Sequence, residues 1–137
     1  DLFQPLPGER RWAHVLLADG NIGIGGDPVR LLGRCRSLIA DDGTVLVETE
    51  PPRAAVPEPE DGRSSPGPVP APRGHDSLDP DGGRVQLRLR DARGSSVAFD
   101  WAFVAADVLA DHAARAGLRV IESWREAGRW FSQLGIR

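Results

Sequence analysis

The segment from Trp12 to Glu50 most constrains the fold, because it reads as a strand, a helix and a second strand joined by short links. The run WAHVLLAD (Trp12–Asp19) is nearly continuously apolar, which is typical of a parallel strand buried on both faces. Asp27 stands at an expected helix N-cap and Pro28 at the first helical position. The run TVLVETE (Thr44–Glu50) predicts the second strand. Such a unit makes the two strands parallel with a right-handed crossover, so the sequence predicts an α/β fold.

The predicted helix between these strands is amphipathic. Its apolar positions recur at helical spacing, and they are Val29, Leu32, Cys35, Leu38 and Ile39. Its arginines are expected mostly to face solvent, and they are Arg30, Arg34 and Arg36. The DDG sequence at Asp41–Gly43 is expected to end the helix and turn the chain into the second strand.

The remainder of the chain predicts a long loop, a hairpin, a helix and a closing hairpin. Residues 51–83 hold nine prolines and five glycines with few large apolar side chains, which predicts a mobile loop inside a single domain spanning 1–137. Arg84–Asp91 alternates polar and apolar residues and is expected to pair with Ser95–Val104. The later elements are a helix with its apolar stripe from Val104 to Ala116, a C′ glycine at Gly117, and antiparallel strands at Leu118–Glu126 and Trp130–Ile136.

Composition excludes several classes of function. A net charge of −3 over 137 residues gives no electrostatic case for binding nucleic acid or an anionic membrane. No apolar run approaches the ~18 residues of a membrane span, and no signal peptide pattern heads the chain. The single cysteine, Cys35, excludes an internal disulfide and a multi-cysteine zinc site. We therefore expect a cytoplasmic protein. His14, His75 and His112 are not spaced as metal ligands, and we expect His14 and His112 to be packed in the core.

The stretch ADGNIGIGGDP (Ala18–Pro28) holds four glycines between the first strand and the helix. A phosphate-binding P-loop needs a lysine beside its last glycine, and this chain has no lysine. A dinucleotide-binding loop would need glycine where Pro28 stands. Asp19 and Asn21, however, follow a parallel strand at the sheet edge where ligands of α/β proteins lie. The sequence thus predicts a small-molecule rim at Asp19 and Asn21, while any single glycine is explained by chain bending alone.

The stretch DGNIGIGGDP…LLGRCRSLIADDGTVLVE, followed by FDWAFV…AGLRVIESW…GRWF, resembles the carboxy-terminal half of class I S-adenosylmethionine-dependent methyltransferases, and is similar to actinobacterial members. The resemblance covers nearly all of the chain outside the proline-rich loop. It implies a partial Rossmann-like sheet made of strands four to seven of the family, with the last strand antiparallel and an extra β-hairpin.

The resemblance also implies a function. It implies methyl transfer from S-adenosylmethionine to a small-molecule acceptor, with Asp19, Gly20 and Asn21 near the cofactor. It implies Asn21 and Trp101 on the acceptor side. Where a general base is needed, it implies Asp19 or a residue of the missing half. The alternative for Phe99 and Trp101 is ordinary packing on the sheet, which we slightly favour. The family's glycine-rich cofactor turn is not in this sequence, so we expect the chain to lack the main cofactor-binding half.

Two alternatives belong to other classes. The exposed edge of a half sheet could make the chain a non-catalytic, self-associating interaction module, with a homodimer formed through that edge. A fragment of a dinucleotide oxidoreductase would bind NAD at Gly23–Gly26, and Pro28 counts against it.

Glu48 and Glu50 end the second strand at the ligand-facing edge of the sheet. They are expected either to contact a ligand or to be exposed to solvent. We expect Trp124, Trp130 and Phe131 of the closing hairpin to be core residues, and Arg125 and Arg129 to lie at the surface.

Overall fold

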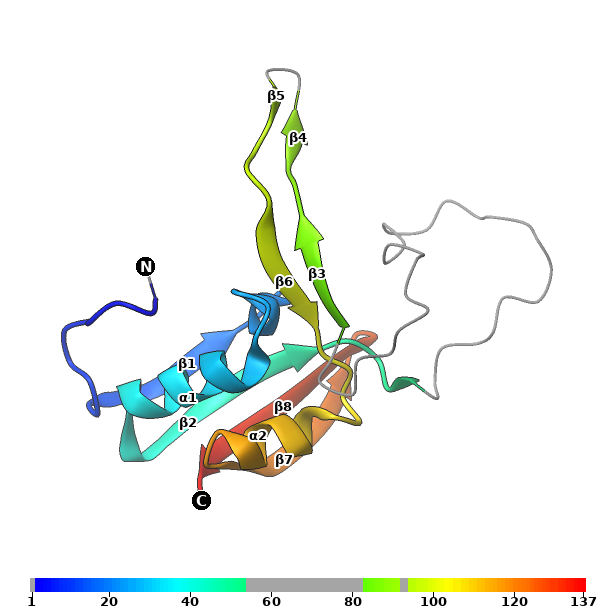
Figure 1. The fold of residues 1–137 in the computed structure, drawn as a ribbon. Helices are drawn as coiled ribbons and strands as arrows, with labels where there is room; N and C mark the ends of the chain where they lie inside the picture. Colours follow the sequence, from blue (N-terminus) through cyan, green and yellow to red (C-terminus); the bar gives the residue numbers. More distant parts are fainter. Residues whose placement is uncertain (1, 54–82, 92–93) are drawn as a thin grey trace.

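A computed structural model describes residues 2–53, 83–91 and 94–137. Within these residues, strands and helices alternate in the first part of the chain, and strands dominate the second part (Figure 1). The elements are, in chain order, β1 (Trp12–Leu17), the 3-10 turn η1 (Asn21–Gly23), α1 (Pro28–Leu38), β2 (Ile39–Thr49), β3 (Gly83–Leu87), β4 (Arg90–Asp91), β5 (Gly94–Ser95), β6 (Phe99–Phe103), α2 (Leu109–Arg115), β7 (Leu118–Glu126) and β8 (Arg129–Ile136).

The main sheet has the strand order β1-β2-β8-β7. β1 and β2 are parallel, which confirms the predicted strand–helix–strand unit. β8 runs antiparallel to both β2 and β7, which confirms the closing hairpin. The predicted mixed sheet with an antiparallel last strand is therefore present, and the first residue of β8 lies at the same sheet edge as the carboxyl end of β2.

The start of α1 follows from its first two residues. Asp27 has an extended backbone, and its carboxylate accepts a hydrogen bond of 2.9 Å from the Arg30 N–H, while Pro28 occupies the first turn. The end of the helix differs from the prediction. Ile39 is already extended, so β2 begins there and Asp41–Gly43 lies inside the strand instead of forming a separate turn. The second strand is therefore longer than predicted and includes the residues of the predicted turn.

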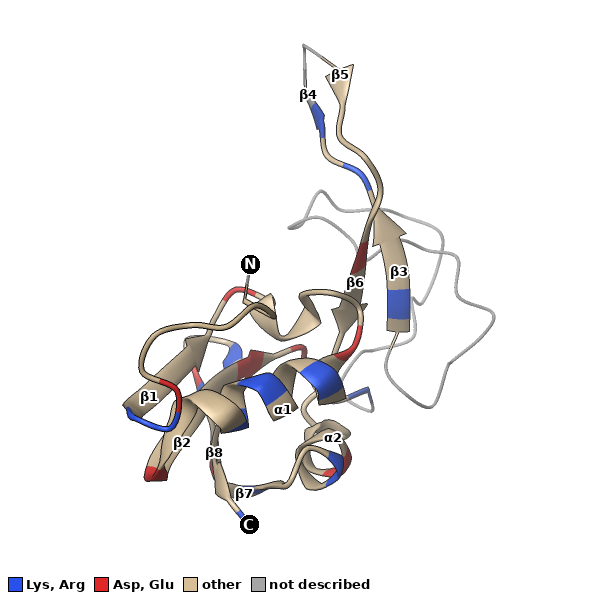
Figure 2. Cartoon of the chain, turned by 60° about the vertical axis from the view of Figure 1, so that its left-hand side comes forward, with Lys and Arg blue, Asp and Glu red and all other residues tan. Residues whose placement is uncertain are grey.

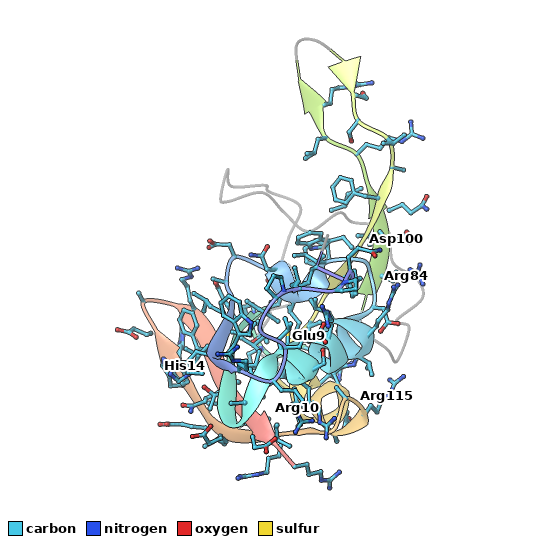
Figure 3. All side chains as sticks on the ribbon, turned by 90° about the vertical axis from the view of Figure 1, so that its left-hand side faces the viewer. Glu9, Arg10, His14, Arg84, Asp100 and Arg115 are labelled. Atoms are coloured by element: carbon cyan, nitrogen blue, oxygen red, sulfur yellow. The ribbon has the colours of Figure 1, made fainter. Side chains whose placement is uncertain are left out.

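Arg34 of α1 is not the solvent-facing side chain that the helical pattern predicted. Its side chain is only 14% exposed. Its guanidinium donates to the carbonyl of Leu2 at 2.9 Å and to the carboxylate of Glu9 at 2.6 Å, so it fastens the first residues of the chain to the helix. Figure 3 labels Glu9 beside α1. The paired guanidinium also lowers the pKa of Glu9.

The hydrophobic core lies between the sheet and the two helices, which cover the same face of it (Figure 1). Both helices and the strands β2, β7 and β8 contribute residues with at most 1% exposure. These are Leu31, Leu32 and Cys35 of α1, Val45 and Val47 of β2, Leu109 and Ala113 of α2, Leu118 of β7 and Leu134 of β8. Gly117 follows α2 with φ of 75°, as expected of a glycine after a helix.

The prediction that Trp12–Asp19 is buried on both faces is wrong. β1 is an edge strand, and Trp12 and Leu16 are 52% and 65% exposed. His14, expected in the core, is exposed, and its Nδ1 lies 2.9 Å from the Thr44 hydroxyl on β2. The physical reason is that α1 and α2 cover one face only. Trp12 and Leu16 are therefore apolar without being buried.

The opposite face of the sheet, which we call the open face, carries further apolar side chains. Trp124 of β7 stacks on Phe131 of β8 with ring centroids 5.7 Å apart. Ile121 is 47% exposed, and a β-bulge at Val120–Glu122 lies at this point of β7. The prediction that Trp124, Trp130 and Phe131 lie in the core is therefore wrong: all three are partly exposed and none belongs to the core cluster.

The predicted middle hairpin forms a separate small sheet. β3 pairs antiparallel with β6, and beyond them β4 pairs with β5, so that the hairpin stands away from the main sheet (Figure 1). At its base, Arg84 of β3 donates to Asp100 of β6 at 2.8 Å, and Figure 3 shows the two side chains together. Almost all of the predicted proline-rich loop, residues 54–82, lies outside the described residues.

Charges of both signs are distributed over the sheet and the helices (Figure 2). In the part of the chain that the structure describes, no helix combines the length and the apolar character needed to cross a membrane.

Candidate functional site

The loop after β1 turns sharply away from the sheet. Asp19 has φ of 55° and Gly20 has φ of 75°, so two successive residues occupy the left-handed region. Aspartate tolerates this region better than most residues, and glycine adopts it freely. The turn leads into η1, where the Asn21 N–H donates to the Ala18 carbonyl at 3.1 Å. Asp19 and Asn21 are both exposed, at the carboxyl end of β1 as predicted.

The other glycines of the loop provide close packing. A Cβ on Gly23 would lie 2.1 Å from the Ala102 carbonyl oxygen, and one on Gly26 would lie 2.8 Å from the Asp100 Cβ. A Cβ on Gly25 would lie 3.2 Å from the ring of Phe3. Hence the loop accommodates the β3–β6 hairpin on one side and the first residues of the chain on the other. No phosphate-binding role is needed to explain these glycines.

Trp101 of β6 lies against this loop. A bridge pairs it with Ile24, and its indole Nε1 is 2.6 Å from the position that a Gly23 Cβ would take. Its Cζ2 reaches within 3.9 Å of the corresponding position at Gly20. The Phe99 ring meets it edge to face at 6.3 Å. The favoured packing interpretation fits these contacts, and they also bring Trp101 beside the turn that carries Asp19 and Asn21.

An arginine and two carboxylates join the ends of three strands next to this turn. The Arg129 Nε donates to Glu48 Oε1 at 2.7 Å, and its Nη2 donates to Glu48 Oε2. The same Nη2 donates to Asp19 Oδ1 at 2.7 Å, while the backbone N–H of Asp19 donates to Glu48 Oε2 at 2.7 Å. Glu48 is 14% exposed at its side chain, Arg129 48% and Asp19 84%.

The pairing between Glu48 and Arg129 favours the charged form of both groups. The hydrogen bonds from Arg129 are the main reason that the pKa of Glu48 is lowered, and desolvation opposes them. The same pairing with Glu48 raises the pKa of Arg129. Glu48 therefore stays a carboxylate over the whole neutral range, which makes it a strong hydrogen-bond acceptor.

Arg125 and Arg129 are exposed, as predicted, but the pairing of Arg129 with Glu48 and Asp19 was not predicted from the sequence. The turn at Ala127–Gly128 places Arg129 first in a strand antiparallel to β2, so it begins where β2 ends. The predicted hairpin already indicated where Arg129 begins its strand. Its pairing could not be predicted, because Glu48 and Asp19 lie 81 and 110 residues away from Arg129 in the chain. Glu50, the other carboxylate considered, is exposed, and its backbone pairs with Val104 and Ala106.

The remaining candidate residues lie elsewhere. His112 is 2% exposed within α2, in agreement with the packing interpretation. His75 falls outside the described residues. Among residues 2–53, 83–91 and 94–137, no three His, Cys, Asp or Glu side chains are grouped as metal ligands.

The structure is similar to solved methyltransferases. The S-adenosylmethionine-dependent methyltransferase from Bacteroides fragilis, in complex with S-adenosyl-L-homocysteine, matches 91% of this chain and 48% of its own, with 18% identity and a TM-score of 0.62. The glycopeptide N-methyltransferase MtfA, also with S-adenosyl-L-homocysteine, matches 100% of this chain and 59% of its own, with 16% identity and a TM-score of 0.57. The CcbJ methyltransferase from Streptomyces caelestis matches 99% and 61%, with 14% identity and a TM-score of 0.57.

This chain has a methyltransferase fold. It is Rossmann-like, and it spans about half the length of the methyltransferases that it matches. Neither a family model nor a curated protein sequence matches the chain. At these identities the likeness concerns the fold, and the methyltransferase fold places the Asp19–Asn21 turn at a carboxyl edge of its sheet.

Proposed function

We propose that this chain is part of an S-adenosylmethionine-dependent methyltransferase that acts on a small-molecule acceptor. The observation that supports this most directly is the exposed Asp19–Asn21 turn at the carboxyl edge of a methyltransferase-type sheet, with Trp101 against it. Among the structural neighbours, the O-methyltransferase NcsB1 has been solved with S-adenosyl-L-homocysteine and 1,4-dihydroxy-2-naphthoic acid. Its matched region covers 100% of this chain at 16% identity, with a TM-score of 0.55.

The residues of the turn suit such ligands chemically. The Asp19 carboxylate accepts hydrogen bonds from an ammonium or hydroxyl group, and the Asn21 amide both donates and accepts. Gly20 has no side chain, so a ligand can approach its backbone closely. The indole of Trp101 offers an aromatic surface beside the turn for a flat or cationic group. We assign Asp19, Gly20 and Asn21 to the cofactor side, and Asn21 with Trp101 to the acceptor side.

Bound S-adenosylmethionine would supply an electrophilic methyl group on a sulfonium. The chain's own residues then have to align the acceptor atom with that group and exclude competing arrangements, since alignment accounts for most of the rate when the nucleophile is electron-rich. Where the acceptor carries a proton, Asp19 is our candidate for the general base, because its exposed carboxylate lies at the rim.

A titration of this chain with S-adenosyl-L-homocysteine, followed by amide chemical shifts, tests the proposal. We expect shifts at Asp19, Gly20 and Asn21, and a loss of these shifts in Trp101→Ala but not in Trp12→Ala, a matched change of a half-exposed tryptophan on β1. Because the family's glycine-rich turn is not among these residues, we expect affinity at least about tenfold weaker than that of a whole methyltransferase. No shift at the turn at millimolar ligand would contradict the proposal.

A second candidate function is self-association without catalysis. The observation in its favour is the outer edge of β1, which pairs with no other strand among the described residues. Trp12 and Leu16 are exposed there, and Ile121 is exposed further along the open face. Sedimentation analysis distinguishes the two. A stable homodimer that gives no response to S-adenosyl-L-homocysteine favours the interaction module. A monomer that responds to the ligand favours the methyltransferase.

A further inference from the structure

Arg129 occupies a position that the closing hairpin fixes closely. Ala127 and Gly128, with φ of 48° and 81°, form a two-residue turn in the left-handed region, which is the turn type that matches the twist of paired strands. Glu126 and Arg129 are the paired residues on either side of it. The backbone of Arg129 is therefore held at the edge where β2 ends, and its side chain needs only to extend along that edge to reach Glu48.

Glu48 is the centre of the cluster. Both of its carboxylate oxygens accept from Arg129, and Oε2 also accepts from the backbone N–H of Asp19. Each hydrogen bond involves a charged group, so it is stronger than a neutral one. With its side chain 14% exposed, Glu48 is also less screened by water than an ordinary surface carboxylate. Glu48 thus links Arg129 of β8 to the backbone that follows β1.

Asp19 is held at two points. Its backbone lies in the left-handed region with φ of 55°, where a residue with a Cβ is strained. The hydrogen bond from its N–H to Glu48 offsets that strain, and the hydrogen bond from Arg129 to Oδ1 fixes the direction of its carboxylate. Without these two contacts, the turn could relax to a backbone conformation that points Asp19 and Asn21 elsewhere.

We propose that Arg129 is a positioning residue, which acts through Glu48 to hold the Asp19–Asn21 turn in the conformation that faces the ligand. The turn then does not have to be ordered when a ligand arrives, and this lowers the cost of binding. The effect of Arg129 on ligand binding rests on the proposed function. Its effect on the conformation of the Asp19–Asn21 turn does not, and can be measured in the ligand-free chain.

The first measurement is amide hydrogen exchange and chemical shift in the ligand-free chain. In Arg129→Gln we expect the Asp19 amide to exchange about tenfold faster and the Gly20 and Asn21 amides to shift, because Glu48 loses the group that orients it. The control is Arg10→Gln. It removes an exposed ion pair of 2.7 Å to Asp41, near the opposite end of β2, and should leave all three amides unchanged.

A reversed pair separates positioning from simple stabilisation. The double change Glu48→Arg with Arg129→Glu restores an ion pair between β2 and β8, but it leaves no carboxylate at position 48 to accept from the Asp19 N–H. We expect the melting temperature to recover relative to Arg129→Gln, while the Asp19 amide stays fast. Recovery of both would show that the ion pair only ties the strands together, and this would overturn the proposal.

The second measurement is affinity for S-adenosyl-L-homocysteine, which should fall about tenfold in Arg129→Gln and less than about twofold in Arg10→Gln. The two proposals fail differently. If the chain gives no response to the ligand while the amide pattern changes as expected, the proposed function is wrong and the positioning role holds. If the ligand binds but the Asp19 amide is unaffected in Arg129→Gln, the positioning role is wrong.

Discussion

The close contact at Gly23 predicts that Gly23→Ala disrupts the packing of the β3–β6 hairpin on the rim loop. The new Cβ would lie 2.1 Å from the Ala102 carbonyl oxygen and 2.6 Å from the Trp101 Nε1, and Cβ contacts under 3.0 Å essentially do not occur. Backbone would have to move by about 0.9 Å at a residue that is 1% exposed. Overpacking usually costs about 1–3 kcal/mol, and we expect about 3 kcal/mol here because backbone, not a flexible side chain, obstructs the methyl group.

Thermal unfolding followed by circular dichroism measures this effect. At roughly 3–6 °C per kcal/mol for a domain of this size, Gly23→Ala should lower the melting temperature by about 10 °C or more. The matched control is Gly33→Ala in α1, where a Cβ meets nothing within 4 Å. That change should stabilise by about 0.5–1 kcal/mol, since alanine is the better helix former. Equal melting temperatures for the two variants would refute the packing argument.

Three further predictions follow from single contacts. Asp27→Ala removes the acceptor for the Arg30 N–H and should cost about 1 kcal/mol in chemical denaturation, with no loss refuting the N-cap assignment. Burial raises the pKa of the Cys35 thiol to about 11, so a thiol reagent at pH 8 should label this only cysteine after unfolding and not before. The pKa of Glu48 is lowered in the fold, so its stabilisation is present above its ordinary pKa of about 4.3 and is lost as pH falls through the lowered value. The stability difference between the wild type and Arg129→Gln should therefore shrink between pH 6 and pH 3, and a constant difference would contradict the cause assigned to this pKa shift.

Local signals predicted the helices and the strand pairing well. Asp27 and Pro28 define the start of α1 because a capping side chain and a fixed proline φ act on their own neighbours. The burial of β1 could not be predicted in the same way. The sequence of an apolar strand is the same whether its outer face is covered or exposed, and the outer face of β1 is exposed in the part of the chain that the structure describes. Only the tertiary arrangement, with both helices on one face, shows that Trp12 and Leu16 are exposed.

The candidate site was predicted in part. The carboxyl edge of a parallel strand indicated Asp19 and Asn21, and both lie exposed on that edge. Their roles in binding stay predictions, as does that of Trp101. The contact of Arg129 with Glu48 could not be predicted, because the sequence around Arg129 does not differ from that of an ordinary surface arginine after a turn. Only the pairing of β8 with β2 brings the two side chains together. Long-range ion pairs leave no local pattern, whereas caps and turns do.

The glycine-rich stretch owes its composition to packing on both sides of the turn. Gly23 and Gly26 admit the β3–β6 hairpin, and Gly25 admits Phe3. None of these contacts requires a ligand, and yet together they hold the loop between two segments that are distant in sequence. Gly20, with φ of 75°, is the member that lets the chain turn beside Asp19. Because this packing holds the loop in place, we would not attribute a weak ligand response to a flexible loop. Gly23→Ala tests this: if the packed loop is needed for binding, the variant should lower both the melting temperature and the response of the Asn21 amide to S-adenosyl-L-homocysteine.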